Sequence, residues 1–159
     1  HFGTLTEASE KRYTLCFILN YRKGERNLKV EVSKRPSKSE FARKDYLGIS
    51  MLVMREEDMV AGKLSALLTR KRFATRDIFD LWFFLKNNWQ INKELVLEKT
   101  GMSLTDALKK TQDQMKNVKK TQLLAGLGDL LQNKQKAWVK EKLIDEVIFQ
   151  LRLYRETHA

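Results

Sequence analysis

Charged side chains interrupt two apolar segments between residues 63 and 85. Lys63 and Arg70 lie seven residues apart, so on a helix they project from one face, offset from the leucines beside them. Asp77 and Asp80 lie three residues apart and share one face of a second helix. Such cations bind phosphate oxygens, and a neighbouring carboxylate orients a cation or accepts a proton. Salt bridges that join the two helices are the alternative that this spacing leaves open.

A carboxylate in a predicted strand is the second candidate for chemistry. Glu31 lies on the polar face of the alternating segment LKVEVS, from which a sheet can present a metal ligand. One carboxylate alone holds Mg²⁺ poorly, because such sites use further carboxylates together with phosphate oxygens. The alternative role for Glu31 is a cross-strand ion pair with Lys29 or Arg22.

Other signatures of catalysis are missing from the sequence. It contains no P-loop or dinucleotide fingerprint, and GLGD at 126–129 is too short to count as one. The only histidines are His1 and His158, which argues against a histidine triad or a zinc site. The single cysteine, Cys16, lies in an apolar run and is predicted to be a buried small hydrophobe. Without a disulfide framework, a cytoplasmic location is the default expectation.

The charge of the chain indicates an anionic partner. Its 159 residues carry a formal net charge of +11, and this field attracts nucleic acid, nucleoside triphosphates or acidic proteins. The segment from Arg22 to Lys44 contains nine Lys and Arg against three Glu, and a second basic run extends from Lys109 to Lys120. No apolar run approaches the length of about eighteen residues that a membrane span requires, so no membrane association is expected.

The first third of the chain reads as β structure. Residues 13–21 and 28–34 predict two strands of a hairpin, the second with Leu28, Val30 and Val32 on a half-buried face. The stretch KRPSKSEFARKDYLG that follows is interpreted as a basic loop. Residues 49–54 are interpreted as a third strand.

Helical periodicity begins at Glu56. An i, i+4, i+7, i+8 stripe of leucine and valine predicts a first packed helix, and Thr75 is the expected N-cap of a second. A short helix over 93–99 that ends at Gly101 is predicted next, and Ser103 opens another that extends to about residue 118. A long amphipathic helix over 134–154 follows. Strands followed by helices predict an α+β fold, with a β-rich domain at 1–55 and a helical domain at 56–159.

Three segments in this order carry a family resemblance. LKVEVS, then KLSALLTR, then RDIFDLWFFL resemble the C-terminal part of the AbiEii/AbiGii toxin family, over roughly residues 28–85. Its members are nucleotidyltransferase-fold proteins of type IV toxin–antitoxin and phage abortive-infection systems. The resemblance implies a short antiparallel or mixed sheet followed by a helical bundle.

The resemblance also implies a chemistry. A nucleoside monophosphate would pass from a nucleoside triphosphate to an RNA acceptor, of which tRNA is one candidate, with Mg²⁺ as cofactor and an antitoxin protein as a further partner. By the same resemblance, Glu31 is a metal ligand and Lys63 contacts the triphosphate. The other matched residues are Arg70 and Arg76, which would support phosphate or the acidic residues, and Asp77 and Asp80, which would act as base or orienting group.

The family's N-terminal signature, a Gly-Gly or Gly-Ser turn before D-x-D, is absent from this sequence. The chain is therefore expected to be a piece of such a protein, and to be inactive alone, because phosphoryl transfer depends on metal and positioning. Two other interpretations stay open. One is a non-catalytic basic helical module that binds nucleic acid or an acidic antitoxin, and the other is a structural helical domain in which Lys63 and Asp80 pair.

Overall fold

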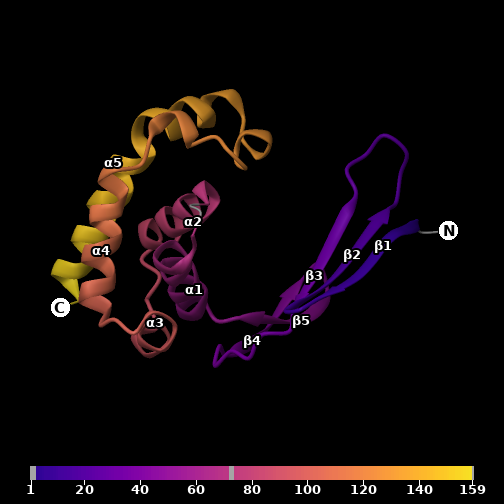
Figure 1. The fold of residues 1–159 in the computed structure, drawn as a ribbon, viewed down its shortest axis with the longest axis horizontal. Helices are drawn as coiled ribbons and strands as arrows, with labels where there is room; N and C mark the ends of the chain where they lie inside the picture. The colour runs from indigo at the N-terminus through magenta and orange to yellow at the C-terminus, as the bar shows by residue number, and fades with distance from the viewer. Residues whose placement is uncertain (1–2, 72–73, 159) are drawn as a thin grey trace. The chain divides into compact units, whose positions relative to one another are not determined.

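The fold is α+β, as the sequence predicts. The computed structural model describes residues 3–71 and 74–158, and these form five antiparallel strands in two small sheets together with five α-helices. The chain divides into two compact units, His1–Lys38 and Ser39–Ala159, which are described separately below (Figure 1). Residues 39–54 belong to the second unit although they are strand-rich, whereas the boundary predicted after residue 55 follows the change from strands to helices.

The first unit is a three-stranded antiparallel sheet in the order β1-β2-β3, made of β1 (Thr4–Lys11), β2 (Thr14–Asn20) and β3 (Leu28–Ser33) (Figure 1). Its β2–β3 pair confirms the predicted hairpin, with Phe17 opposite Val30 and Cys16 opposite Glu31. Cys16 is buried, as predicted. Strand β1, which the sequence interpretation did not include, pairs with the other edge of β2.

One prediction about this sheet is wrong. Strand β3 has the expected alternation, but all six of its residues are exposed, including Leu28, Val30 and Val32. These three side chains lie opposite Leu19, Phe17 and Leu15 of β2. The two strands together form an apolar face, but the three β3 side chains on it remain exposed. A three-stranded sheet cannot bury its own faces, because burial requires a second layer.

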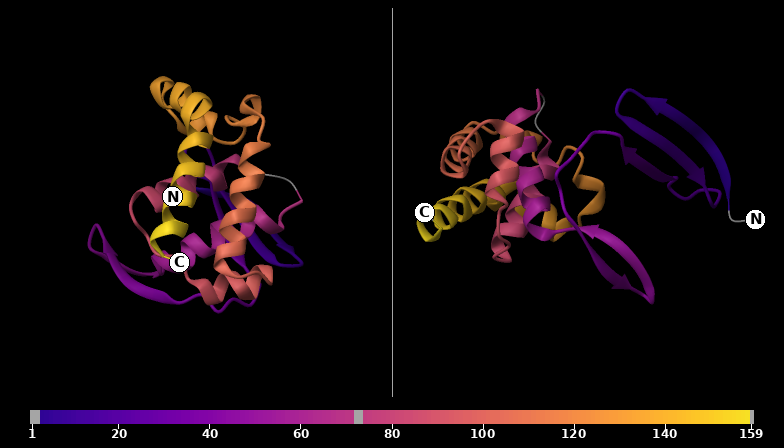
Figure 2. Two further views of the ribbon diagram at one scale, coloured as in Figure 1. Left: turned by 90° about the vertical axis from the view of Figure 1, so that its left-hand side faces the viewer. Right: turned by 90° about the horizontal axis from the view of Figure 1, so that it is seen from below.

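The second unit begins with a β-hairpin that the sequence interpretation missed. Strand β4 (Phe41–Tyr46) lies inside the segment predicted as a basic loop and pairs with β5 (Ile49–Met54), so the loop prediction is wrong there. The two-residue turn between them, Leu47 and Gly48, has positive φ at both positions, which is the geometry of a type I′ turn. Figure 2 shows this hairpin extending from the helices of the same unit.

Five helices form the rest of the second unit, and the segment between the last two contains two short 3₁₀ turns, Lys120–Gln122 and Gly128–Leu130. The helices are α1 (Glu56–Thr69), α2 (Thr75–Lys86), α3 (Lys93–Thr100), α4 (Leu104–Lys116) and α5 (Asn133–Thr157). Helix α1 packs against α2, α3 and α4, and α5 packs along α2 and α4 (Figure 1). The buried stripe predicted for α1, which includes Val60, Leu64 and Leu67, lies in the shared core. Among the described residues, no helix combines the length and apolarity of a membrane span.

The ends of the helices test the predicted caps. Ser103 caps α4 by accepting a hydrogen bond from the Asp106 amide, and Gly101 ends α3 in the left-handed conformation, both as predicted. Thr75 is not the N-cap of α2, because it is the first helical residue and Ala74 precedes it. Its hydroxyl donates instead to the carbonyl of Gln122, a contact between distant segments that local sequence does not reveal.

Asp58 attaches the hairpin to the helices. Its buried carboxylate, in the first turn of α1, accepts hydrogen bonds from the Glu40 amide at 2.5 Å and from Asn92 Nδ2 at 2.6 Å. The Asn92 side chain in turn accepts from the Leu95 amide and caps α3. One carboxylate therefore connects the start of β4, the start of α1 and the start of α3.

Candidate functional site

The charged residues predicted from spacing meet in one cluster between α1 and α2. Lys63 of α1 places its Nζ 2.9 Å from Asp77 Oδ1 and 2.6 Å from Asp80 Oδ2, both on α2. Arg70, which directly follows α1, binds the other oxygen of Asp77 through its Nη1. Because α1 packs against α2, residues with helical spacing on each of them face one another. We call Lys63, Arg70, Asp77 and Asp80 the charged cluster.

The two carboxylates of the charged cluster differ in accessibility. The Asp77 side chain is only 2% exposed and each of its oxygens faces a cation, whereas that of Asp80 is 30% exposed. Lys63, at 31%, is also partly open to solvent, and Arg70 is more so. Asp77 thus serves to hold the two cations in place, while Asp80 and the cations keep surface that a ligand can reach.

The charged cluster keeps Lys63 protonated. Burial by itself lowers the pKa of the Lys63 ammonium, but hydrogen bonds to Asp80 and Asp77 and the attraction of both carboxylates outweigh it, so the pKa is raised from 10.5. A permanently charged ammonium held in one orientation suits an electrostatic contact with phosphate, and it cannot act as a general base near neutral pH.

Two predicted residues, Arg76 and Glu31, do not take part in the ion pairs of the charged cluster. Arg76 lies on α2 beside Asp77, but its side chain is exposed and forms no ion pair with any described residue. Glu31 lies in the first unit, where its carboxylate is 2.9 Å from Lys29 Nζ. Lys29 is one of the two partners expected for the alternative role, but both residues lie on β3, so this ion pair is not the expected cross-strand one. That pairing raises the pKa of Lys29 through the hydrogen bond to Glu31.

The described residues do not by themselves fit a Mg²⁺ site. Among residues 3–71 and 74–158, no group of three or more His, Cys, Asp or Glu side chains is arranged to hold a metal ion. Glu31, the one predicted ligand, has an ammonium on its carboxylate, and both oxygens of Asp77 are bound by cations. A divalent cation would have to displace these positive charges, so we derive no step through a metal.

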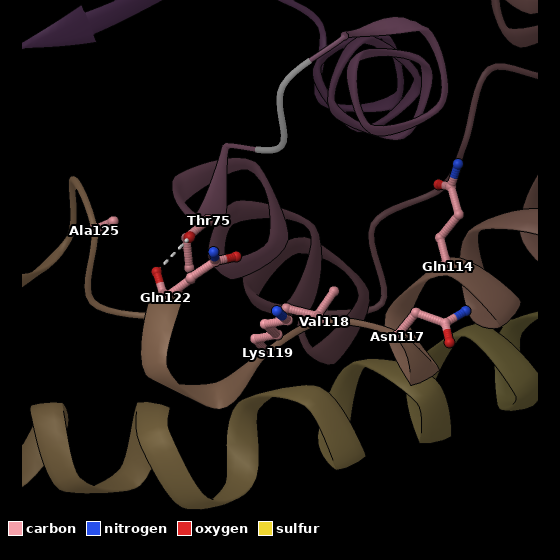
Figure 3. A pocket seen from close by; sticks show the side chains of 7 residues that line it. All are labelled: Thr75, Gln114, Asn117, Val118, Lys119, Gln122 and Ala125. Atoms are coloured by element: carbon pink, nitrogen blue, oxygen red, sulfur yellow. Dashed lines mark hydrogen bonds between the residues drawn. The ribbon is translucent and has the colours of Figure 1, made fainter.

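A pocket with both polar and apolar lining adjoins the first turn of α2. The sequence interpretation did not include this pocket. The pocket has a volume of about 630 Å³ and lies between α2, the C-terminal end of α4 and the segment after it. Figure 3 shows Gln114 of α4 and Asn117, the residue after α4, on one side, Thr75 and Gln122 on the other, and Lys119 between them. The basic run that begins at Lys109 was the only sequence signal near this pocket, since amide side chains far apart in sequence give no pattern of their own.

A second, shallower hollow continues from this pocket along α4. It shares Gln114 and Asn117 with the pocket and is also lined by Lys109, Lys110 and Asp113. We call the pocket and the hollow together the α4 groove. The groove and the charged cluster belong to the same unit, since Thr75 lies two residues before Asp77 on α2.

Comparison with solved structures supports the nucleotidyltransferase-like fold. A crystal structure described as a "putative nucleotidyltransferase" from Helicobacter pylori superimposes with a TM-score of 0.60 at 21% identity, over 97% of this chain and 65% of that one. JHP933 from Helicobacter pylori aligns with a TM-score of 0.48 at 20% identity, over 97% of this chain and 66% of that one. The chain thus spans just under two-thirds of the length of each, and no curated protein matches it.

The family follows from the sequence itself. Residues 13–149 match the model of the nucleotidyl transferase AbiEii toxin family of type IV toxin–antitoxin systems. This match covers most of the chain and extends well beyond the residues 28–85 that carry the three motifs. The protein belongs to this AbiEii family, as the resemblance predicts.

Proposed function

We propose that the charged cluster is the triphosphate-binding wall of a nucleotidyltransferase that transfers a nucleoside monophosphate from a nucleoside triphosphate to RNA. The observation that carries the proposal is the placement of Lys63. Its ammonium is fixed between Asp77 and Asp80, and about one-third of its side-chain surface remains open. A cation oriented in advance loses less conformational freedom when it contacts a phosphate oxygen.

In this proposal each residue of the charged cluster has a distinct role. Lys63 contacts the triphosphate, and Arg70 offers its exposed guanidinium nitrogens to the same phosphates while one nitrogen holds Asp77. Asp77 is a positioning residue, because its two oxygens are already bound by cations. Asp80 is the accessible carboxylate, which orients Lys63 or accepts a proton from the acceptor hydroxyl. Arg76, which is exposed and directly precedes Asp77 on α2, adds positive charge near the phosphates.

The proposal also covers the divalent metal and the RNA acceptor. Members of the family use nucleoside triphosphates and a divalent metal, and Glu31 remains our candidate ligand by resemblance. Because the described residues do not fit Mg²⁺ by themselves, we propose that this chain alone binds triphosphate without transferring the nucleotide. An assay with the four triphosphates and a pool of tRNA would overturn this part if the chain catalysed clear incorporation.

Equilibrium dialysis with radiolabelled triphosphates tests the phosphate-binding role. Lys63→Gln should weaken binding at least about tenfold, because it removes a charge-assisted hydrogen bond worth roughly 1.5–3 kcal/mol. Lys93→Gln is the matched control, since Lys93 is an exposed lysine at the start of α3 that lies outside the charged cluster and the α4 groove. Equal affinity of the two variants would mean that the charged cluster only joins two helices.

A structural role for the charged cluster is the main competitor. The ion pair between Lys63 and Asp80 is also what a purely structural helical domain predicts. The two functions separate in the Asp80→Asn variant. The proposal expects this variant to change triphosphate affinity while the fold is kept, whereas a structural role expects a change in thermal stability alone.

A further inference from the structure

The α4 groove is lined by residues that do not belong to the charged cluster. Its deeper part is lined by a hydroxyl and by carboxamides, those of Gln114, Asn117 and Gln122 (Figure 3). A carboxamide presents a hydrogen-bond donor and an acceptor side by side, which matches the edges of nucleobases. A volume of about 630 Å³ lies within the usual range for a small-molecule site.

One groove residue carries an acceptor with no partner among the described residues. The Oε1 atom of Gln114 is buried and receives no hydrogen bond from any residue that the structure describes. Buried polar atoms are nearly always paired, and an unpaired one costs about 1–3 kcal/mol. Thr75 on the opposite wall, by contrast, already donates to the Gln122 carbonyl and so fixes that wall against α2. Because this oxygen of Gln114 is buried, a ligand in the groove would reach it only after the Gln114 side chain rotates, and a hydrogen bond donated to it would then remove the unpaired acceptor.

The shallower part of the groove is positively charged. Lys109 and Lys110 line it, and Lys119 lines the deeper part. Asp106 and Asp113 line the shallower part as well: Asp113 binds Lys116 at 2.8 Å, whereas Asp106 accepts from the uncharged hydroxyl of Ser103 and keeps its negative charge. The pKa of Asp113 is lowered, first by its hydrogen bond to Lys116 and then by the attraction of that ammonium, so this carboxylate is ionised and neutralises Lys116. With Asp113 balanced by Lys116, the three groove lysines exceed the single charge of Asp106, so the groove has a net positive charge.

We infer that the α4 groove binds a single strand of nucleic acid, with one unpaired base in the deeper pocket and its neighbouring phosphates on Lys109 and Lys110. Single strands are commonly held in this way, with bases splayed into polar or aromatic sites and phosphates on lysines. The inference deepens and rests on the proposed function, since it assigns a place to the acceptor strand. Thr75 connects the groove to α2, the helix that carries Asp77 and Asp80.

Fluorescence anisotropy with two labelled oligomers of twelve units separates base from phosphate recognition. One oligomer is a mixed-sequence RNA, and the other is an abasic sugar–phosphate chain of the same length and charge. Lys109→Gln/Lys110→Gln should weaken binding of both by about five- to tenfold at low salt, and should lower the salt slope by about 1.4, or about 0.7 per phosphate contact. The control Lys93→Gln/Lys99→Gln removes the same charge from exposed positions on α3 and should have little effect.

The amide variant tests the base pocket. Gln114→Leu/Asn117→Leu should weaken binding of the RNA about tenfold and leave the abasic oligomer unchanged, whereas the control Gln112→Leu, on the same helix, should change neither. Equal loss for the two oligomers, or no loss beyond the control, would overturn the base pocket. If the lysine variant equals its α3 control, the groove is not the binding surface.

Two further outcomes complete the test. A free nucleoside monophosphate that binds as tightly as the RNA would contradict the assignment of a strand. Lys63→Gln should leave RNA binding intact, because Lys63 lies outside the α4 groove. If the wild type binds RNA through the groove but binds no triphosphate, the proposed function is refuted and this inference is not. The lysine variants lie on the surface of α4, so their result stands even if the amide variant does not fold.

Discussion

The sharpest consequence of the charged cluster concerns Asp77→Asn. This change keeps the shape of the side chain but removes the negative charge that Lys63 and Arg70 share. An amide can accept from only one of the two cations, and its NH₂ group then faces the other. Asp77 is nearly fully buried, so water cannot take the place of the lost charge at its own position.

The size of the effect follows from the exposure of the partners. Two charge-assisted hydrogen bonds to a buried carboxylate would each contribute roughly 1.5–3 kcal/mol in full burial. Lys63 and Arg70 are 31% and 51% exposed, so both cations regain water when the charge is removed. We therefore expect a net loss of about 2 kcal/mol in the free energy of unfolding. For a chain of this size this corresponds to a decrease of about 4–8 °C in Tm.

Thermal unfolding followed by circular dichroism measures this loss, with Asp80→Asn as the matched control. Asp80 is 30% exposed and, among residues 3–71 and 74–158, pairs with Lys63 alone, so its replacement should cost less than about 1 kcal/mol. A loss for Asp80→Asn as large as that for Asp77→Asn would refute the reasoning from burial.

The pH dependence gives a second measurement on the same variant. The pKa of Lys63 is raised in the folded state, so its stabilising contribution is fully present below the unfolded pKa of 10.5 and disappears as pH increases through the folded value. Asp77→Asn should therefore lose less stability than the wild type between pH 10 and 12. An identical alkaline loss in both proteins would contradict the assignment.

Three other substitutions test the supporting structure. Tyr154→Phe leaves the buried Ile91 amide without its 2.9 Å acceptor and should lower the free energy of unfolding by about 1–3 kcal/mol. Burial raises the pKa of Tyr154 in the folded state, so the wild type loses stability above pH 10.0 and the variant should lose less. Denaturation at several pH values measures both effects. Asp58→Ala should destabilise by about 3 kcal/mol and accelerate amide hydrogen exchange in β4, since the Glu40 amide loses its acceptor. Ser103→Ala should cost about 1 kcal/mol in urea unfolding, through loss of the α4 cap.

Sequence patterns predicted most helices because each helix carries its own periodic signal and, for α3 and α4, its own capping residue. The β4–β5 hairpin escaped prediction because its turn, Leu47-Gly48, lacks the Asn-Gly or Asp-Gly that usually marks a type I′ turn. Its strands also carry Arg43 and Lys44, and such basic residues suggested a loop. The exposed face of β3 could not be foreseen either, because alternation shows which residues share a face but not whether another layer covers it.

The charged cluster was predictable in composition but not in geometry. The spacing of Lys63, Arg70, Asp77 and Asp80 placed their side chains on facing sides of two helices. It could not indicate that Asp77 is buried and binds both cations while Asp80 stays accessible, because that depends on how α1 and α2 pack. The α4 groove needs the contact between Thr75 and Gln122, which lie 47 residues apart. Only the basic run of α4 pointed to it.

The central claim is that the charged cluster binds the triphosphate of a nucleotide. The most direct test is to titrate the ¹⁵N-labelled protein with each nucleoside triphosphate and to follow its amide NMR signals. We expect shifts in α1 near Lys63 and in the first two turns of α2 that saturate with triphosphate. In Lys63→Gln these shifts should need at least about tenfold more triphosphate to saturate, whereas Lys93→Gln should saturate like the wild type. Shifts confined to other parts of the protein, or shifts that persist unchanged in Lys63→Gln, would contradict the claim and leave the charged cluster as a joint between two helices.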